Sequence, residues 1–471
     1  MKKKVVLINP PLYFSHGIPH ALDVSVPPLG LIYLASYVNK YSKRFKASVI
    51  DVGAESFSLS QMRSELERLK PFAIGISSMT PQLQGAVELA RFLKKNFKKD
   101  FKNFLGGPHV SADPDFINRF KGIFDYAITG EAEKTFLESI EKLLDGQKIS
   151  KIQAGEVVMD LDLIPLPDRK LIKREKYSQR ESMLFSRGCP YHCYYCSRPS
   201  ISRFVRYRSV NNLITEIKGV YRYCRGKIDF QDDTFNLNRN RVLEFCAAVK
   251  KEKLKLDWRC NARIDLADEE LIKKMKEAGC SLIHFGIEAG NERIRREVVN
   301  KGTFTNQQIY DVISWCQKYK IKFAGYFMMG HPGETSKNLK ETQQMILKSG
   351  INLLGLSIPT PFPGSKLYKI ACRRGIVNSK IIDAFAKKKL GEGYVGNYPV
   401  LVSEKLTEER VFGFMQETNR KFYLNFKTLV RKFREDFGSF TKLSRDAGDL
   451  FSLILRGIST RKPYINKKIN R

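Results

Sequence analysis

Tryptophan and histidine are scarce in this 471-residue sequence, with two and six residues, and long apolar runs are missing. No apolar stretch approaches the roughly 18 residues that a membrane-spanning helix needs. The first segment, MKKKVVLINPP, has four apolar residues before Asn9 and two prolines, which is too short for a secretory signal. These absences predict neither a membrane span nor an export signal, and the first segment is typical of a buried strand.

Disulfide-type cysteine spacing is also absent. Six of the nine cysteines are scattered along the chain without a pairing framework, which predicts free thiols in a reducing cytoplasm. The other three lie within the segment SRGCPYHCYYC, from Ser186 to Cys196. The scattered ones are Cys224, Cys246, Cys260, Cys280, Cys316 and Cys372.

Acidic residues are few compared with basic ones, 49 against 82, which gives a formal charge of +33 and a pI near 9.7. This excess is compatible with nucleic acid, an anionic membrane surface or an anionic substrate as a partner. The lysines are spread through every region, so a solvated basic surface without a specific partner explains the charge equally well. The length predicts two or three domains, each with its own core.

The three clustered cysteines carry the most specific signal. Cys189, Cys193 and Cys196 are separated by three and then two residues, so one short loop can turn three thiolates toward a common point. A structural zinc site needs a fourth ligand, and His192, inside the loop, is poorly placed to supply it. A four-iron cluster can instead take three thiolates and leave one iron open for a substrate.

The pattern Cys-x3-Cys-x-aromatic-Cys, with Tyr195 as the aromatic residue, resembles the signature of radical S-adenosylmethionine (SAM) enzymes. The resemblance implies a 4Fe-4S cluster held by Cys189, Cys193 and Cys196, with SAM bound at the open iron. It also implies a one-electron donor, such as flavodoxin or ferredoxin, as a partner.

Residues 1 to 150 alternate short apolar runs with helical patterns, which predicts an α/β domain with a doubly wound parallel sheet. Strands are expected over 5–9, 47–52, 72–78, 103–107 and 126–130, and helices over 27–41, 60–69, 82–97 and 135–144. Ligands of such sheets bind at the carboxyl ends of the strands, where this sequence has small and hydroxyl residues. They are Ser77, Ser78, Gly106, Gly107, Gly130 and Glu131.

Taken together, these turns resemble the cobalamin-binding domain that precedes many radical SAM cores, as does the Pro27–Leu31 segment. The resemblance implies cobalamin as a further cofactor. The chain departs from one motif of such domains, Asp-x-His-x-x-Gly, because none of its six histidines has that context. Cobalamin is therefore expected to bind without that histidine as a cobalt ligand, and loss of the cofactor stays open.

Residues 151 to 180 contain Pro165 and Pro167 with mixed charge and are expected to form an extended linker. From 181 to 375 the alternation resumes, with strands expected over 183–187, 227–231, 256–260, 282–287, 322–328 and 352–358. The six units resemble the partial (β/α)6 barrel of radical SAM enzymes, which places its chemistry at the carboxyl ends of the strands.

The motifs at these strand ends are the candidate SAM site. The family resemblance implies that Asp232 or Asp233 accepts the SAM amino group, although the usual glycines are absent there, and that Glu288 binds the ribose hydroxyls. Gly330 and Gly333 would permit close approach of the backbone to the adenine. Arg263 could face the substrate or the SAM carboxylate, or form a surface ion pair. One of Arg295, Arg296 and Lys301 could also reach the SAM carboxylate, and spacing does not decide which.

Residues 376 to 471 are expected to be basic and mainly helical. From 366 to 471 there are 24 Lys and Arg against 10 Asp and Glu, a net charge of 24 minus 10, or +14. Arg420 to Glu435 predicts an amphipathic basic helix. It could pack against the barrel or lie on an anionic membrane surface, which would place the enzyme at the inner membrane face and allow a lipid substrate.

The expected function is methyl transfer to an unactivated carbon of a small molecule or lipid, with the cluster, SAM and cobalamin as cofactors. Radical cyclisation or rearrangement on the same scaffold is the alternative within the enzyme class. An RNA-modifying radical SAM enzyme would explain the charge. Methylthiotransferases, however, typically carry further cluster cysteines in their N-terminal domain, and the first cysteine here is Cys189.

Overall fold

The computed structural model describes residues 2–20, 26–97, 101–198, 201–202, 204–302, 304–389, 398 and 400–424. By packing, the chain divides into two compact units. The first unit comprises Met1–Phe235, Ala247–Trp258 and Pro361–Pro399, and the second comprises Asn236–Cys246, Arg259–Thr360 and Val400–Arg471. Each unit therefore gathers segments that are distant in the sequence.

A six-stranded parallel sheet in the first unit has the strand order β4-β1-β5-β6-β7-β8. The order reverses at β1, as expected for a doubly wound sheet, and all five predicted strands are confirmed. The sixth strand, β8, comes from the segment expected to be an extended linker. The strands are β1 (Lys3–Asn9), β4 (Phe45–Asp51), β5 (Ala73–Ser77), β6 (Lys102–Gly106), β7 (Tyr126–Thr129) and β8 (Ile152–Ala154).

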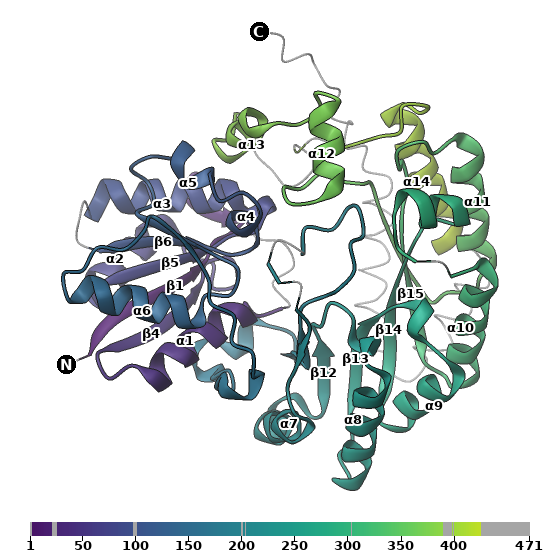
Figure 1. Ribbon diagram of the computed structural model, residues 1–471, viewed down its shortest axis with the longest axis horizontal. Coiled ribbons are helices and arrows are strands. Elements are labelled where there is room, and N and C mark those ends of the chain that lie inside the picture. Colours follow the sequence, from purple (N-terminus) through teal and green to yellow (C-terminus); the bar gives the residue numbers. More distant parts are fainter. Residues whose placement is uncertain are drawn as a thin grey trace. The chain divides into compact units, whose positions relative to one another are not determined.

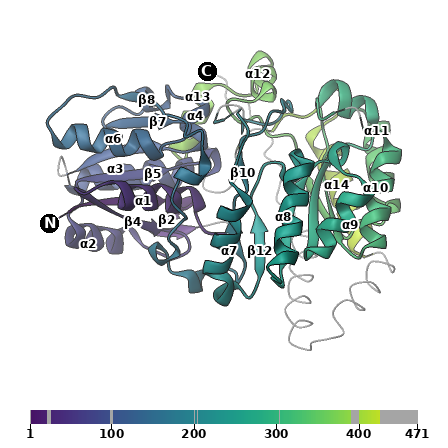
Figure 2. The same cartoon turned by 60° about the horizontal axis from the view of Figure 1, so that its bottom comes forward.

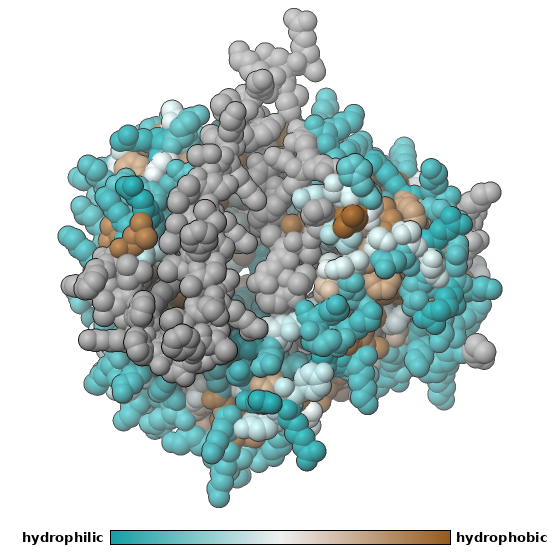
Figure 3. All heavy atoms as spheres, turned by 180° about the vertical axis from the view of Figure 1, so that it is seen from behind, coloured by the Kyte–Doolittle hydropathy of each residue, from teal (hydrophilic) through white to brown (hydrophobic). Residues whose placement is uncertain are grey.

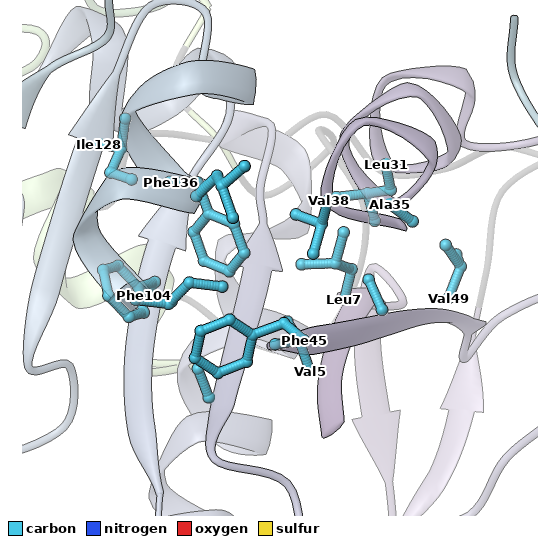
Figure 4. Close-up of a cluster of buried hydrophobic side chains, with 14 residues drawn as sticks. Val5, Leu7, Leu31, Ala35, Val38, Phe45, Val49, Phe104, Ile128 and Phe136 are labelled. Atoms are coloured by element: carbon cyan, nitrogen blue, oxygen red, sulfur yellow. The ribbon is translucent and has the colours of Figure 1, made fainter. Parts of the chain in front are cut away.

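Helices cover both faces of this sheet (Figure 1). The strands are continuous apolar runs because both faces are buried, as VVLI at 5–8 illustrates. On one face, Leu31 and Val38 of α1 and Phe136 of α6 pack against Leu7 and Phe104 of the strands (Figure 4). The four predicted helices are confirmed as α1 (Leu29–Tyr41), α2 (Leu59–Leu69), α3 (Leu83–Phe97) and α6 (Glu133–Leu144).

Short elements that the sequence did not predict lie in the connections of the first unit. A small hairpin precedes α1, and two short helices lie between β6 and β7. The expected linker also contains three single-turn 3-10 helices, two of which are capped by Asp160 and Asp168. These elements are β2 (Tyr13–Ser15), β3 (Ile18–His20), α4 (Pro108–Ala112), α5 (Phe116–Arg119), η2 (Leu161–Leu163), η3 (Arg169–Leu171) and η4 (Arg174–Lys176).

The second sheet has the strand order β16-β15-β14-β13-β12-β9, so consecutive strands are neighbours. β9 pairs in parallel with β12, and β15 pairs in parallel with both β14 and β16. Because β9 and β16 are the two edges, the sheet is open, as expected for a partial (β/α)6 barrel. The strands are β9 (Glu181–Met183), β12 (Lys227–Phe230), β13 (Asp257–Ala262), β14 (Cys280–Glu288), β15 (Lys322–Met328) and β16 (Leu353–Ser357).

Helices alternate with the strands of the second sheet. In the second unit, α9, α10 and α11 lie on the same side of β14 and β15 in both views (Figures 1 and 2). Beyond Met183 the chain leaves the sheet and forms a two-stranded hairpin, β10 (Ser186–Arg187) with β11 (Arg206–Tyr207), where one strand over 183–187 was predicted. The helices are α7 (Val210–Cys224), α8 (Arg239–Lys251), α9 (Glu269–Glu277), α10 (Asn306–Lys318) and α11 (Ser336–Lys348).

In the part of the chain that the structure describes, three helices follow β16: α12 (Lys366–Arg373), α13 (Ser379–Ala386) and α14 (Glu408–Tyr423). In the second unit, α14 packs on α11 and β16: Gln343 donates to Thr418 at 3.0 Å, and Phe414 and Phe422 are buried. The predicted helix Arg420–Glu435 lies outside the described residues beyond Leu424, and its first residues form the last turn of α14.

Among the side chains that Figure 3 colours by hydropathy, most are hydrophilic, and the apolar ones form small separate patches. Among the helices in the described part of the chain, none combines the length and the apolarity that crossing a membrane requires.

Candidate functional site

A cavity of about 530 Å³ lies in the first unit, at the carboxyl ends of the strands of the first sheet. Its apolar wall includes Leu7, Phe104 and Phe136, from the core on which α1 and α6 pack. The remaining wall comes from the segments around the cysteine loop and β12. The predicted ligand-binding turns thus share one cavity with residues that flank the cysteine loop, while Cys189, Cys193 and Cys196 themselves are not among its lining residues. Its polar and glycine residues include Gly30, Ser77, Gly106, Gly107, Gly130, Glu131, Glu133, Ser186, Arg187, Arg198, Gln231 and Asp233.

Glycines keep part of this cavity open. A Cβ at Gly30 would meet no atom within 4 Å, and one at Gly106 would meet only the carbonyl oxygen of Ile128, at 3.9 Å. Gly107 and Gly130 have φ angles of +95° and +74°, which L side chains rarely adopt. A Cβ at Gly107 would also lie 2.7 Å from the Ser77 hydroxyl. The backbone can therefore approach a large ligand closely, which fits a corrinoid cofactor.

The Ser77 and Ser78 turn is fixed by the neighbouring strand. Ser77 lines the cavity, whereas Ser78 is buried and its hydroxyl donates to the Met79 carbonyl at 3.0 Å. The Ser78 backbone N–H donates to the Gly106 carbonyl at 3.0 Å. Of the two predicted serines, Ser77 is thus the one whose side chain a ligand in this cavity can meet.

His109 follows the Gly106-Gly107-Pro108 turn but does not line the cavity. Its ring is fully buried, contacts Phe116 edge-on at 4.8 Å between centroids, and its Nδ1 lies 3.0 Å from the Thr80 hydroxyl. Burial lowers the pKa of His109 to about 4, so the ring is neutral at pH 7. Among the described residues that line the cavity, there is no histidine.

A buried ion network joins the carboxyl end of β7 to the segment before the cysteine loop. Arg187, which directly precedes Gly188 and Cys189, donates to Glu131 at 2.9 Å and lies 2.8 Å from Glu133. Arg206 of β11 also donates to Glu131, and its side chain is 4% exposed. Burial alone would raise the pKa of Glu131, but Arg206 and Arg187 outweigh it and hold this pKa below its usual value.

The cysteine loop places its thiols near one another. Cys196 accepts a hydrogen bond from the Arg198 backbone at 3.4 Å, and the Cys189 sulfur lies 3.8 Å from the Thr234 hydroxyl. Burial, together with the nearby Cys193 and Cys189 thiols and Asp233, raises the pKa of Cys196 to about 11. Among the described residues, no three ligand side chains are grouped for a single metal ion. A four-iron cluster does not require this, because each thiolate binds a different iron.

The two candidate carboxylates after β12 have different surroundings. Asp232 is fully buried and accepts hydrogen bonds from the Phe185 N–H at 3.0 Å, the Ser186 N–H at 2.5 Å and the Ser186 hydroxyl at 2.5 Å. Burial raises its pKa to about 6, against the lowering effect of these donors. Asp233 instead lines the cavity and pairs with Arg198 at 2.6 Å. Asp233 is therefore the better placed of the two to meet a cofactor in this cavity.

In the second unit, Glu288 ends β14 with a left-handed φ of +72° and is buried. Its Oε1 pairs with Lys301 at 3.0 Å, and a Cβ at Gly286 would meet both side chains within 2.6 Å. Glu288 and Lys301 therefore lie together over a glycine at the carboxyl end of the strand. Of the four basic residues considered for the SAM carboxylate, this position favours Lys301.

The other three basic candidates also have partners in the second unit. Arg295 is fully buried and donates to the Ala289 carbonyl at 2.6 Å, while Arg296 is exposed beside Glu297. Arg263 pairs with Asp265 at 2.7 Å and donates to the backbone carbonyl of Lys301, so it lies next to Lys301.

The turn after β15 contains Gly330 and Gly333, with φ angles of +101° and +74°. Glu334 holds the turn, because its carboxylate accepts the N–H groups of Gly330 at 2.7 Å and of His331 at 2.9 Å. Burial raises the pKa of Glu334 to about 7. The His331 ring is buried, with Nε2 3.2 Å from the Glu288 carbonyl oxygen, which links this turn to the end of β14.

Sequence reasoning did not single out Arg187, Arg206 or Glu133, which build the ion network of the cavity. Arg187 stands two residues before Cys189, but a single arginine there carries no pattern. Arg206 and Arg208 alternate with Tyr207, which is a pattern typical of a strand. In the structure both arginines are buried and pair with buried glutamates, so this pattern was a signal that the sequence offered.

Two family models match the chain. One, described as the radical SAM superfamily, matches residues 183–346, and the other, described as the B12 binding domain, matches residues 20–140. The first match contains the three clustered cysteines together with Asp233, Glu288 and Gly330. The second contains Ser77, Gly107 and Glu131.

Curated relatives match nearly the whole chain. "Uncharacterized methyltransferase PH0819" of Pyrococcus horikoshii is 30% identical over 460 residues, covering 93% of this chain and 96% of the relative. The anaerobic magnesium-protoporphyrin IX monomethyl ester cyclase of Rubrivivax gelatinosus is 25% identical over 458 residues, covering 92% of this chain and 79% of the cyclase.

Among solved structures, the radical SAM methyltransferase TsrM from Kitasatospora setae, with cobalamin and a [4Fe-4S] cluster bound, has the same fold. The TM-score is 0.71 at 16% identity, covering 89% of this chain and 91% of that one.

Proposed function

The chain belongs to the radical SAM enzymes that carry a cobalamin-binding domain, and on this premise we propose that it transfers a methyl group to an unactivated carbon of its substrate. When bound, the cluster with SAM supplies a carbon-centred radical, and cobalamin supplies the methyl group. The observation that carries the proposal is the single cavity lined both by the strand ends of the first sheet and by residues beside the cysteine loop.

We propose that Cys189, Cys193 and Cys196 hold the cluster. In the first unit, Asp233 would accept the SAM amino group, because it lines the cavity while the carboxylate of Asp232 is bonded to Phe185 and Ser186. The second unit would hold the nucleoside part of SAM through Glu288 and the Gly330 and Gly333 turn. Lys301, paired with Glu288, would then be available to the SAM carboxylate.

Ser77, Gly106, Gly107 and Gly130 would face the corrinoid, and Glu131 would fix the turn beside it. We propose that no histidine binds the cobalt, because His109 is buried against Phe116 and bonded to Thr80. The electron paramagnetic resonance spectrum of the cob(II)alamin form should show no splitting from a protein imidazole. A nitrogen-split signal that disappears in His109→Ala would contradict this.

Deuterated SAM tests the reaction itself. The reduced enzyme would receive SAM with a deuterated methyl group and the small-molecule and lipid extract of its source cells. We expect a labelled product, with 5'-deoxyadenosine and S-adenosylhomocysteine formed in about equal amounts, because one SAM is cleaved and one donates its methyl group. Formation of 5'-deoxyadenosine without label in any product would overturn methyl transfer.

Radical cyclisation or rearrangement is the second candidate. The 25% identity to a cyclase over 92% of this chain favours it, since that enzyme shares both halves of the architecture. The same deuterated-SAM experiment separates the two, because ring closure yields 5'-deoxyadenosine without matching S-adenosylhomocysteine.

The partners follow from the chemistry and the charge. A one-electron donor such as flavodoxin or ferredoxin would reduce the cluster. The basic C-terminal region would contact anionic membranes and give access to a lipid substrate, although residues 425–471 lie outside the described part of the chain. Binding to anionic liposomes that weakens at high ionic strength is expected, and equal binding to neutral liposomes would argue against it.

A further inference from the structure

A second cavity, of about 570 Å³, lies in the first unit and shares no lining residue with the first cavity. Its walls come from the segment that enters β9, from the last turn of α7, and from Pro27 before α1. Four of its twelve lining residues are arginines, and two are glutamates. A cavity with this charge balance favours an anionic occupant.

Of the two glutamates on this wall, Glu181 is already paired with arginines, whereas Glu175 is exposed and pairs with no arginine of the described residues. Glu181 pairs with Arg174 and, at 3.3 Å, with the buried Arg169. Arg180 pairs with Asp257 and lies 3.6 Å from Asp229. Two of the four lining arginines are thus neutralised within the fold.

The other two arginines, Arg222 and Arg225, are exposed, and no carboxylate of the described residues pairs with them. They lie three positions apart at the end of α7, so both reach the same cavity. Cations at a helix C-terminus stabilise the helix, which explains one such residue but not their common placement on a cavity wall.

Arg174 adds a buried donor to the same wall. Its guanidinium lies 3.4 Å from the centroid of the Tyr223 ring, and its Nε is buried and has no hydrogen-bond partner among the described residues. Burial, together with the nearby Arg169, lowers the pKa of Arg174. Buried donors in folded proteins are nearly always paired, so this one points to an acceptor supplied by a ligand. The Tyr223 ring is 59% exposed and can stack on a planar group.

We propose that this basic cavity, lined by Arg174, Arg222, Tyr223 and Arg225, binds a small polyanion, with phosphate or several carboxylates as the recognised groups. Guanidinium groups hold such oxygens through paired, charge-assisted hydrogen bonds. The proposal stands on the geometry of this cavity and does not depend on the reaction that the enzyme catalyses.

An occupant of the basic cavity would touch two segments that continue into the first cavity. Pro27 lies two residues before Leu29, and Glu181 lies three residues before Leu184, and both Leu29 and Leu184 line the first cavity.

Calorimetric titration of the full-length holoenzyme with inorganic pyrophosphate, citrate and AMP, at constant ionic strength, tests the proposal. We expect at least one of them to bind, and the Arg222→Ala/Arg225→Ala variant to lose about tenfold or more in affinity, as the loss of charged hydrogen bonds predicts. Preference for pyrophosphate or AMP over citrate identifies a phosphate ligand, and the reverse identifies a polycarboxylate.

The matched control is Arg91→Ala/Arg373→Ala, which removes two exposed arginines outside the cavity that, among the described residues, pair with no carboxylate. It should retain the affinity, and Arg222→Lys/Arg225→Lys should restore part of it. Absence of binding to the wild type, or an equal loss in the control variant, would overturn the proposal.

Discussion

The Glu131→Gln variant is expected to lose about 3 kcal/mol of stability, because it leaves two buried guanidinium groups with too little negative charge. In the wild type, Glu131 and Glu133 balance Arg187 and Arg206, and the side chains of Glu131 and Arg206 are 8% and 4% exposed. Denaturant unfolding at pH 7 measures the loss. Less cobalamin should also bind, since three of these four residues line the cavity.

The control is Glu156→Gln, which removes one charge from the exposed pair that Glu156 forms with Lys134 at 2.5 Å. An exposed pair contributes little, so its loss should stay below about 0.5 kcal/mol. If Glu131→Gln loses no more than this control, the ion network does not stabilise the fold.

The stability that Glu131 contributes depends on pH. Its pKa is lowered in the folded protein, so its contribution is fully present above the ordinary glutamate pKa of about 4.3 and is lost as the pH falls through the folded value. The difference between the wild type and Glu131→Gln should therefore narrow on acidification below about pH 4. A difference that grows in this range would contradict the assigned direction.

The Cys189→Ala/Cys193→Ala/Cys196→Ala variant is expected to bind no cluster and to cleave no SAM. Anaerobic reconstitution should give about four irons per chain for the wild type and none for the variant, since these thiolates would be the only protein ligands of the cluster. Iron analysis and the ultraviolet-visible spectrum measure the first effect, and 5'-deoxyadenosine formation measures the second.

A second triple variant, Cys224→Ala/Cys246→Ala/Cys372→Ala, serves as the control because it removes the same number of thiols outside the loop. It should reconstitute like the wild type. A full cluster in the loop variant, or loss of the cluster in the control, would refute the assignment of the three ligands.

The strands of the first sheet were largely predictable because most are buried on both faces and appear as apolar runs, as at 5–8. β15 was predicted over 322–328 and has these bounds, because a mainly apolar segment lies between Lys322 and Gly330. The expected single strand over 183–187 is interrupted at 184–185, so that its end belongs to β10 and not to the second sheet. The reason lies outside the segment: the backbone N–H groups of Phe185 and Ser186 donate to Asp232, a residue about 46 positions away, and do not continue the ladder of β9.

The residues of the candidate site were predictable where a local sequence motif contains them. They were not predictable where side chains distant in the sequence come into contact. Spacing identified Cys189, Cys193 and Cys196, and glycines marked the strand ends. Spacing did not separate Asp232 from Asp233, because the difference is the burial of one against Phe185 and the position of the other on a cavity wall. The pairing of Glu131 with Arg187 joins residues 56 positions apart, and no local pattern records it.

The position of Arg187 bears on how the chain can be divided. Its ion pairs attach the residues directly before Cys189 to the end of β7, and residues 152–154 form the last strand of the first sheet. A fragment that starts at residue 181 would retain the cysteines but would expose Arg187 and Arg206 without Glu131. The cluster-binding half therefore cannot be expressed or exchanged by itself without leaving these arginines unpaired. Chimaeras that exchange the cobalamin-binding half between relatives must exchange the two glutamates together with Arg187 and Arg206.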